Sequence, residues 1–239
     1  MRRIAITGAA GGIGAALARH FLARGWAVAG IDRAEFPDDL AQAAAMRCFA
    51  ADITDEAAVE GAMGAAAADG PLHALIANAA VTDLDHHRAL DIPYATWARV
   101  LRVNVDGAFL SARAAARRMG EGGNIVFVTS SLARLSDAQA GDAPYCTSKA
   151  AVEMLARVLA IELATVGINV NTLYPSAMID TGFFAHWPEE RRAALAAPSL
   201  LNATALHLAG LAPGAATGRS LDQERWERDA AYRADWGAA

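Results

Sequence analysis

The feature that most constrains the fold is a run of glycines between a short apolar stretch and a helical one. Arg3 to Thr7 is mostly apolar, the segment from Gly8 to Gly14 is rich in glycine, and Ala15 to Arg24 has helical character. A strand, a glycine turn and a helix N-terminus leave free backbone N–H groups and the positive end of the helix dipole facing the turn. The segment lacks the Gly-Lys-Ser/Thr of a nucleoside-triphosphate loop. It predicts either a pyrophosphate site or a tight turn that only connects strand to helix.

The rest of the chain repeats the alternation of buried strand and helix. We predict strands at 26–31, 46–50, 73–77 and 123–129, and long helices at 93–119 and 143–166. This order is typical of an α/β fold in which helices cover both faces of a parallel sheet. The 239 residues contain no Pro/Ser-rich linker, charge block or internal repeat, so we expect a single domain over residues 1–239.

Composition argues against several classes of protein. The hydrophobic fraction of 54% is inflated by alanine, and no apolar run near either end is long enough for a membrane span or a signal peptide. We therefore expect a cytoplasmic protein without membrane contact. A net charge of −5 argues against a general nucleic-acid surface. Cys48 and Cys146 have no metal-ligand spacing and suggest no disulfide framework.

Polar side chains follow the predicted strands. Asp32 lies 18 residues past Gly14, where a dinucleotide fold places the acid that binds the adenosine ribose, although an ordinary solvated acid fits as well. Arg33 beside it could meet a 2′-phosphate instead. Asp52 ends the third strand, and Thr54 is a candidate N-cap with two acids in the first helical turn behind it.

Two asparagines stand at sites that need an explanation. Asn78 ends the fourth strand and is followed by small residues that leave room for a planar ligand. Asn104 lies in the middle of an apolar helical stretch, where a buried amide must be hydrogen-bonded. Either asparagine can serve a ligand or only a neighbouring turn.

Tyr145 and Lys149 are four residues apart at the start of an Ala-rich helix and therefore share one helix face. A close ammonium favours the phenolate form of a phenol whose ordinary pKa is about 10. We therefore expect Lys149 to lower the pKa of Tyr145, which would make the phenol a proton donor and acceptor near neutral pH. By itself such a pair also occurs on many solvated helix faces.

Taken in order, these motifs closely resemble those of short-chain dehydrogenases/reductases over about residues 3–181. The matching segments are Thr7-Gly8-Ala9-Ala10-Gly11-Gly12-Ile13-Gly14, Asp52-Ile53, Asn78-Ala79-Ala80, Asn104, Ser130-Ser131, Tyr145-x-x-x-Lys149 and Ile168-Asn169-Val170-Asn171-x-x-x-Pro175. The resemblance implies a Rossmann-like doubly wound sheet of order 3-2-1-4-5-6-7, with the cofactor at the carboxyl ends of the strands.

The resemblance also implies roles for individual residues. Tyr145 would be the acid/base, Lys149 would bind the nicotinamide ribose, Ser131 would orient the substrate oxygen and Asn104 would hold a water relay. Ser130 rivals Ser131, because the loop to Tyr145 is one residue longer than is usual in the family. The residues expected to bind NAD are Gly8, Gly11, Gly12, Ile13, Gly14, Asp32, Arg33, Asp52, Ile53, Asn78, Tyr145, Lys149 and Ile179.

The resemblance thins after Thr181. The segment 182–201 is a short substrate lid whose aromatic residues, with 81–90 and 134–139, would line a pocket; core packing is the plainer alternative. The expected lid residues are Phe183, Phe184, His186 and Trp187. His86 and His87 show no third ligand, so we expect no metal site.

We therefore expect an NAD-dependent oxidoreductase that interconverts a secondary alcohol and a ketone, both small molecules. The alternatives are reduction of a carbon–carbon double bond, whose branch of the family spaces its Tyr and Lys more widely, and a non-catalytic dinucleotide-sensing or scaffold protein.

Family members commonly pair through the two long helices, so we expect a homodimer or homotetramer. The tail, 222–239, replaces the usual family ending. Glu224/Arg228 and Asp229/Arg233 predict a helix there that buries Trp226 and Trp236 on its own subunit or a neighbour; a frayed, solvated tail is the alternative.

Overall fold

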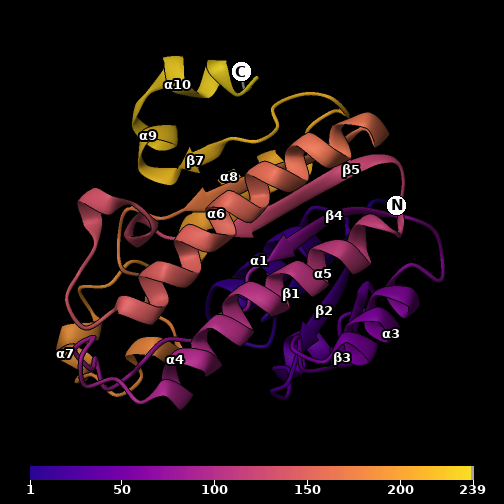
Figure 1. Cartoon of the computed structure of the whole chain (residues 1–239). Helices are drawn as coiled ribbons and strands as arrows, with labels where there is room; N and C mark the ends of the chain where they lie inside the picture. Colours follow the sequence, from indigo (N-terminus) through magenta and orange to yellow (C-terminus); the bar gives the residue numbers. More distant parts are fainter. Residues whose placement is uncertain (238–239) are drawn as a thin grey trace.

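The computed structural model describes residues 1–237 and is built around one parallel sheet of seven strands (Figure 1). The strand order is β3-β2-β1-β4-β5-β6-β7, as the sequence resemblance implies. Every neighbouring pair is parallel. The strands are β1 (Arg3–Thr7), β2 (Ala27–Asp32), β3 (Met46–Ala50), β4 (Leu72–Ala77), β5 (Met119–Val128), β6 (Ile168–Tyr174) and β7 (Ser220–Asp222).

Helices cover both faces of this sheet. One face carries α1 and α8, and the other carries α3, α5 and α6, with α4 packed against α6 (Figure 1). The helices are α1 (Gly12–Ala23), α2 (Asp38–Ala41), α3 (Glu56–Ala66), α4 (Tyr94–Leu101), α5 (Gly107–Ala116), α6 (Ala143–Leu163), α7 (Glu189–Arg192), α8 (Asn202–Ala209), α9 (Gln223–Arg228) and α10 (Ala230–Asp235). Within residues 1–237, no helix is both long and apolar enough to cross a membrane.

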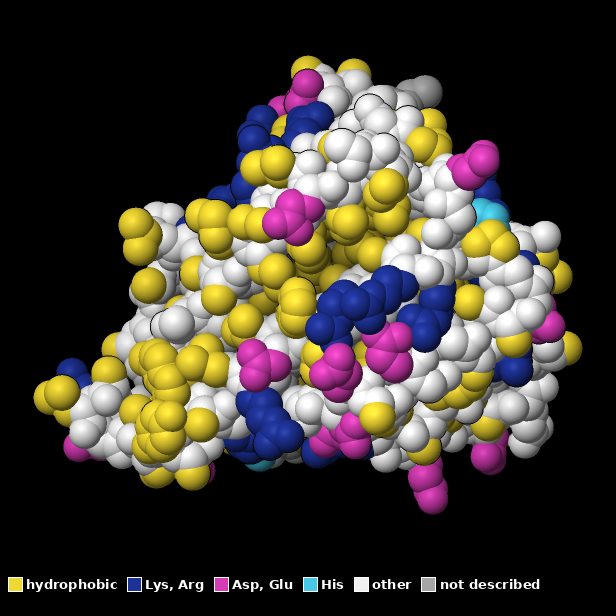
Figure 2. Space-filling view, turned by 45° about the vertical axis from the view of Figure 1, so that its right-hand side comes forward, with side chains coloured by type: hydrophobic (Ala, Val, Ile, Leu, Met, Phe, Trp, Pro, Cys, Tyr) yellow, Lys and Arg dark blue, Asp and Glu magenta, His cyan; other side chains and the backbone are white. Residues whose placement is uncertain are grey.

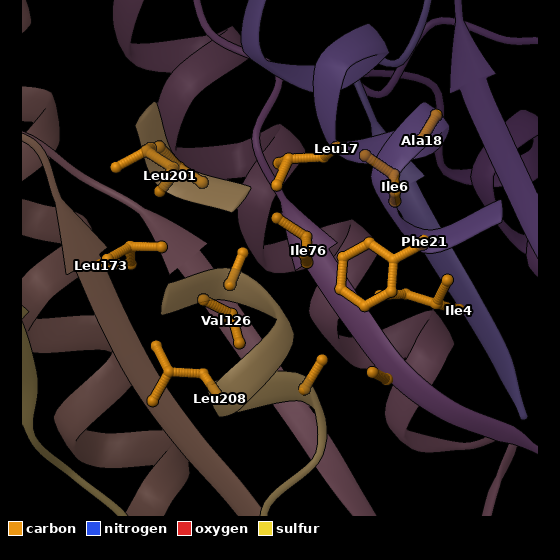
Figure 3. Close-up of a cluster of buried hydrophobic side chains, with 14 of the residues drawn as sticks. Ile4, Ile6, Leu17, Ala18, Phe21, Ile76, Val126, Leu173, Leu201 and Leu208 are labelled. Carbon is orange, nitrogen blue, oxygen red and sulfur yellow. The ribbon is translucent and has the colours of Figure 1, made fainter. Parts of the chain in front are cut away.

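The core consists of two apolar layers because successive side chains of a strand point to opposite faces. Ile4 and Ile6 of β1 pack with Phe21 of α1 on one face, whereas Ala5 belongs to the layer on the other face. Figure 3 shows the first layer, with Leu17 of α1 and Leu208 of α8 set over the middle of the sheet. Because helices cover both faces, the inner strands β1, β2 and β4 are almost entirely apolar, as expected for a parallel sheet.

The parallel arrangement brings the ends of the strands to one edge. Thr7, Asp32, Ala77 and Val128 are the last residues of β1, β2, β4 and β5. The sheet order reverses between β1 and β4, and such a switch point opens a crevice at the carboxyl ends of the strands. The polar residues that follow these strands therefore meet at this crevice.

The prediction of one long helix over 93–119 is wrong in the middle and at the end of this range. The α-helical hydrogen bonds are interrupted by a π-helical turn, Arg102–Asp106, and Met119 already belongs to β5. The widened turn contains Asn104, whose amide bonds to the backbone of Val81. The strand begins early because Met119 pairs with Leu72 of β4.

The predicted cap at Thr54 is also wrong. Asp55 is the N-cap of α3, and its carboxylate accepts a hydrogen bond from the N–H of Ala58. Thr54 is instead turned back to Asp52, to which it donates both its N–H and its hydroxyl. Because Thr54 is hydrogen-bonded to Asp52, its side chain does not cap the helix, and Asp55 caps it instead.

The tail forms two short helices rather than the single helix predicted from its charge pattern. Asp229 is extended between them and caps α10 by accepting the N–H of Tyr232. It pairs with Arg225, while Arg233 donates to the carbonyl groups of Trp226 and Glu227. Asp229 therefore does not form the predicted i,i+4 pair with Arg233; it acts as the N-cap of α10 and ends the helical segment before it.

The tail nevertheless buries both tryptophans on its own subunit. Trp226 stacks on His207 of α8 with ring centres 4.4 Å apart, and the carbonyl of Trp236 contacts the His207 ring. Trp236 is only 2% exposed. The Tyr232 hydroxyl accepts the N–H of Asp222, at the free edge of β7. The tail thus covers the outer edge of the sheet, and a frayed tail is excluded for the residues described.

Candidate functional site

A cleft of about 1060 Å³ opens at the carboxyl edge of the sheet. The glycine turn and the ends of β2 and β4 line one side, and the start of α6 and the segment after Pro175 line the other. The expected residues that it brings together are Gly8, Gly11, Gly12, Ile13, Asp32, Arg33, Asp52, Ile53, Asn78, Ser131, Tyr145, Lys149 and Ile179. Gly14 and Asn104 lie behind this lining and support it.

The glycine turn is shaped so tightly that side chains could not replace two of its glycines. Gly8 has φ +68°, and a Cβ on Gly14 would lie 2.0 Å from the carbonyl oxygen of Gly8. At Gly11, by contrast, a Cβ would meet nothing within 4 Å. Helix α1 begins here without a side-chain cap, so its first N–H groups face the open cleft. An anion such as a pyrophosphate fits this cradle.

Thr7 is a functional residue that the sequence reasoning missed as an individual side chain. Its hydroxyl accepts the N–H groups of both Asn78 and Ala79, at 3.0 and 3.1 Å. In return the Asn78 amide donates to the carbonyl groups of Thr7 and Gly8. Asn78 is therefore used to bind the glycine turn to the end of β4, the structural role left open for it. The signal in the sequence that could have identified Thr7 is a polar residue at the end of a buried strand.

Asp32 is held with its carboxylate at the cleft. One oxygen accepts the N–H of Ala10 in the glycine turn, and the other accepts the N–H of Ala34, both at 3.0 Å. A carboxylate has about four acceptor positions, so lone pairs remain for a ligand. Arg33 leans away toward Asp52, with 3.5 Å between the nearest charged atoms.

Asp52 and the two isoleucines complete this side. The two hydrogen bonds from Thr54, with the positive charge of Arg33, hold the pKa of Asp52 below its usual range. Ile53 is buried against Gly107, where a Cβ would come within 2.5 Å of the isoleucine side chain. Ile179 is 5% exposed and pairs with Ala196 of the lid through an isolated bridge.

Tyr145 and Lys149 lie at the floor of the cleft, near the start of α6. The Lys149 ammonium is 5.6 Å from the centre of the Tyr145 ring and donates to the carbonyl of Val128 at 2.8 Å. Lys149 is 4% exposed, and burial lowers its pKa from 10.5 to about 8.

The expected lowering of the Tyr145 pKa is wrong for the chain by itself. Burial raises the pKa of the phenol, and the negative charge of Asp142 adds to this, while a hydrogen bond with Ser130 works against it. Lys149 does not offset the burial because its ammonium is turned to the Val128 carbonyl. The surroundings of the two groups therefore favour a neutral phenol on the half-buried Tyr145 and a weakly held proton on the buried Lys149.

Glu153 lies one turn beyond Lys149 on α6 and was missed in the sequence. Its carboxylate accepts hydrogen bonds from the hydroxyls of Thr129 at 2.6 Å and Thr172 at 2.8 Å. Its charge opposes the effect of burial on Lys149 and raises the pKa of that ammonium. An acid four residues after a lysine on a helix is a signal that sequence reading could have used.

The two serines have different positions. Ser130 caps the short turn Ser131–Ala133 by accepting the N–H of Leu132. Ser131 lines the cleft, whereas Ser130 is not among the lining residues. The structure thus places Ser131, the serine that the sequence motif favours, on the open side, and its role toward the substrate stays a prediction.

Asn104 is 2% exposed and fully engaged within the protein. Its amide oxygen accepts the N–H of Val81, and its amide nitrogen donates to the Val81 carbonyl and to the Ser148 hydroxyl. Asn104 therefore ties the segment after β4 to α6, next to Lys149. This is a structural role, and the water relay implied by the family resemblance stays a prediction.

The lid and two loops line the substrate side of the cleft. Phe183 meets the edge of the Tyr145 ring with centres 6.0 Å apart, and Phe184 and Trp187 line the cleft beside it. His186 is exposed and is not among the lining residues. From the loop that precedes α6, Gln139, Ala140 and Asp142 contribute to the lining.

The neighbouring residues His86 and His87 have different surroundings. His86 lines the cleft, whereas the His87 ring bonds to Asp83 at 2.9 Å. Asp83, Asp85 and His87 bring three potential ligand atoms within 4.8 Å of one another, a third residue that the sequence did not reveal. The buried Asp83 carboxylate is already used by the N–H groups of Asp85 and His87, so these contacts account for the cluster as a closed turn.

Comparisons with known proteins agree with this geometry. A family model described as short chain dehydrogenase matches residues 2–192. Cis-4-hydroxycyclohexanecarboxylate dehydrogenase of Sinomonas cyclohexanicum is 38% identical over 200 residues, which cover 80% of this chain and 79% of the relative. Galactitol 2-dehydrogenase (L-tagatose-forming) of Cereibacter sphaeroides is 39% identical over 177 residues, with coverages of 72% and 69%.

A similar solved structure extends the likeness to the fold. The crystal structure of a short-chain type dehydrogenase/reductase from Mycobacterium marinum has a TM-score of 0.82 at 29% identity, and the match covers 92% of this chain and 93% of that one. Together with the match of the family model over most of the chain, these findings establish that the chain belongs to the short-chain dehydrogenase family.

Proposed function

We propose that the chain is an NAD-dependent dehydrogenase that interconverts a secondary alcohol and a ketone, with Tyr145 as the acid/base. The observation that carries the proposal is the placement of Tyr145 and Lys149 on one face of α6, in the same cleft as the glycine turn. An anion cradle and a proton-transferring phenol in one cleft suit hydride transfer from or to a dinucleotide.

The cofactor side of the cleft supports NAD. The open cradle at Gly11 and the uncapped start of α1 would hold the pyrophosphate, and Asp32 would accept hydrogen bonds from the adenosine ribose hydroxyls. A 2′-phosphate in the same place would face the Asp32 carboxylate. Arg33 softens this repulsion only in part, because it is already shared with Asp52.

The chemistry divides between the cofactor and this chain. Nicotinamide supplies or accepts the hydride. Tyr145 moves one proton to or from the substrate oxygen, and Ser131 stabilises the negative charge that develops there by donating its hydroxyl. Lys149 would bind the nicotinamide ribose and, with its positive charge, favour loss of the phenol proton. Phe183 shields the phenol from water on the lid side.

The relatives support an alcohol as substrate. The names of the two relatives describe dehydrogenation of a hydroxyl group on a ring and of the second carbon of a polyol. In both cases a secondary alcohol would yield a ketone. The three residues between Tyr145 and Lys149 also match the alcohol-oxidising pattern rather than the wider spacing of the enoyl-reducing branch.

We also propose a homo-oligomer that forms through α5 and α6. Both helices expose large apolar side chains, namely Phe109, Met154, Val158 and Ile161. Figure 2, turned by 45° from Figure 1, shows hydrophobic side chains gathered in a hollow, with arginine and acidic side chains along its border. A contiguous apolar surface of this kind suits a second copy of the chain. The particle mass in solution should exceed the 24.9 kDa of one chain.

The test is steady-state turnover with NADH and NADPH over a panel of ketones, and with NAD⁺ and NADP⁺ over the matching alcohols. A panel of activated alkenes and a measurement of NADH binding complete it. Reduction of ketones with NADH supports the proposal. Reduction of alkenes alone would point to a double-bond reductase, and NADH binding without any turnover would point to a sensing or scaffold protein.

A further inference from the structure

A histidine–carboxylate pair lies in the cleft close to Tyr145, and the proton-transfer scheme leaves it unused. The His86 Nδ1 and an Asp142 oxygen are 3.1 Å apart, and both residues line the cleft. Asp142 precedes Tyr145 by three residues and acts on the phenol through its charge. The pair thus belongs to the substrate side, within reach of a molecule bound at Tyr145.

The backbone at His86 is held in an unfavourable conformation to place this side chain. His86 has φ +50°, the only positive φ at a non-glycine residue within the described chain. The turn that imposes it is closed by Asp83, whose buried carboxylate accepts the N–H groups of Asp85 and His87. Strained backbone that its surroundings over-determine is characteristic of ligand sites.

The Asp142 side chain does not cap α6, although its position in the sequence predicts that role. It is the N-cap residue of α6, and an aspartate there ordinarily accepts the first free N–H groups of the helix. The Asp142 side chain makes no such bond and reaches to His86 instead. Only 14% of its side chain is exposed, whereas 48% of the His86 side chain is open.

The two loops approach so closely that the pair is fixed. Gly141 has φ +92°, and a Cβ there would lie 3.0 Å from the carbonyl oxygen of His86. A glycine immediately before Asp142 therefore permits the contact between the loop that follows β4 and the loop that precedes α6. The pair is a built feature of the cleft and not a chance meeting of two flexible side chains.

From this geometry we infer that His86 and Asp142 form a subsite for a second hydroxyl group of the substrate, so that the preferred substrate is a diol or polyol. The inference rests on the proposed dehydrogenase function. An ionised carboxylate only accepts hydrogen bonds, so the imidazole donates through Nδ1 to Asp142, and the Asp142 carboxylate keeps further acceptor positions for a substrate O–H. A hydroxyl group both donates and accepts, so it can also form a hydrogen bond with Nε2 of His86. The Asp142 carboxylate disfavours an anionic substrate group at the same place.

The experiment compares alcohols that differ only in the second hydroxyl. Wild-type kcat/KM is measured with NAD⁺ and, in parallel, NADP⁺ for cyclohexanol, for the cis isomers of cyclohexane-1,2-, 1,3- and 1,4-diol, and for cis-4-hydroxycyclohexanecarboxylate. We expect at least one diol to exceed cyclohexanol by about tenfold or more, as for a hydrogen bond to a charged group. Diols within about threefold of cyclohexanol, or a preference for the carboxylate alone, would overturn the inference and leave the dehydrogenase proposal standing.

Variants then assign the preference to the pair. His86→Gly removes the side chain without opposing the positive φ, and we expect it to bring the diol-to-cyclohexanol ratio close to one; Asp142→Asn should reduce it in the same direction. Leu84→Ala, an exposed residue of the same loop outside the lining, is the matched control and should keep the wild-type ratio. His86→Asn tolerates the same backbone and replaces the glycine variant if that variant does not fold.

A wild-type diol preference that survives both His86→Gly and Asp142→Asn would contradict the assignment. If no alcohol is oxidised with either cofactor, the dehydrogenase proposal itself fails and this inference falls with it. The two failures are therefore distinguishable.

Discussion

The two sides of the cleft are built in different ways. On the cofactor side, Asp32, Asp52 and Asn78 each bond to backbone groups of the first four strands or of the residues that follow them. On the substrate side, the lining comes from the loops 81–92 and 131–142 and from the segment 176–201. Met178 and Leu135 are 59% and 100% exposed in these segments. On the first side, backbone hydrogen bonds hold the polar side chains in place, whereas the second side exposes large apolar side chains.

This difference separates a general function from a particular one. Parallel strands fix the cofactor side because their ends must meet at one edge of the sheet. The substrate side depends on contacts between loops that are distant in sequence, such as His86 with Asp142. A dinucleotide can therefore be inferred from the first side, while the choice of alcohol is decided on the second.

The largest expected effect follows from removing Lys149, which lies between the cofactor side and the substrate side. Lys149→Met should lower turnover by about 10²–10⁴-fold, because in the proposed mechanism this cation binds the nicotinamide ribose and favours loss of the phenol proton. The same change should stabilise the fold at pH 7. A lysine pKa of about 8 instead of 10.5 means that burying the charged ammonium destabilises the fold by roughly 3 kcal/mol. The variant avoids this cost but loses the hydrogen bond to Val128, so we expect its free energy of unfolding to rise by about 1–2 kcal/mol.

The sign of the pH dependence follows from the lowered pKa. Between pH 8 and 10.5 the folded chain binds fewer protons at Lys149 than the unfolded chain, so stability from this group rises with pH across that window. The advantage of Lys149→Met should thus shrink between pH 7 and pH 10. Chemical denaturation at both pH values measures it, and a variant that is less stable at pH 7 would show that the lysine carries no burial cost.

Gly14→Ala should damage the cofactor side more than any change of a surface glycine. The new Cβ would lie 2.0 Å from the Gly8 carbonyl oxygen and 2.8 Å from the Asn78 amide. We expect a loss of about 2–4 kcal/mol in unfolding free energy or an equivalent loss of NADH binding. Gly61→Ala is the control, because a Cβ there meets nothing within 4 Å and alanine favours its helix. Equal stability of the two variants together with equal NADH binding would refute the tight turn.

Cofactor choice should follow Asp32. We expect wild-type kcat/KM to favour NADH over NADPH by about tenfold or more, and Asp32→Ala to reduce that ratio, because the repulsion of a 2′-phosphate is removed. Arg33→Ala should leave NADH preferred. Comparable efficiencies of NADH and NADPH with the wild-type enzyme would contradict the assignment of Asp32.

The smallest effect concerns the substrate side. Asp142 raises the pKa of Tyr145, so Asp142→Asn should lower it and move the rise of alcohol oxidation with pH toward lower pH by up to about one unit. The opposite direction, or no shift, would show that Asp142 does not act on the phenol. Asp137→Asn, which removes an acid of the same loop that lies outside the cleft lining, serves as the control.

Sequence reasoning succeeded where local pattern determines structure. The glycine turn and the Tyr145/Lys149 pair follow from periodicity and spacing, and the strand order follows from the family resemblance that these motifs carry. The π-helical turn at Asn104 could not be predicted, because it depends on a bond to Val81 in another segment. The helix break at Asp229 likewise arises where one residue can serve either as an i,i+4 partner or as a cap.

The error about the Tyr145 pKa has a different origin. Spacing alone brings an ammonium near a phenol but does not reveal that the Val128 carbonyl takes the ammonium or that burial acts on both groups. Ser130 and Ser131 could likewise be told apart only by the turn that follows β5, which Ser130 caps while Ser131 lines the cleft. Each case depends on the direction of a side chain rather than on its place in the sequence.

The most direct test of the account is Tyr145→Phe, with turnover and NADH binding measured on the same preparation. The phenol hydroxyl acts on the substrate, whereas the ring packs against Phe183 and stays in place. The account predicts that turnover falls by about 10²–10⁴-fold while the dissociation constant of NADH stays within about threefold of wild type. A variant that retains more than about a tenth of the wild-type rate would contradict the assignment of Tyr145 as the acid/base.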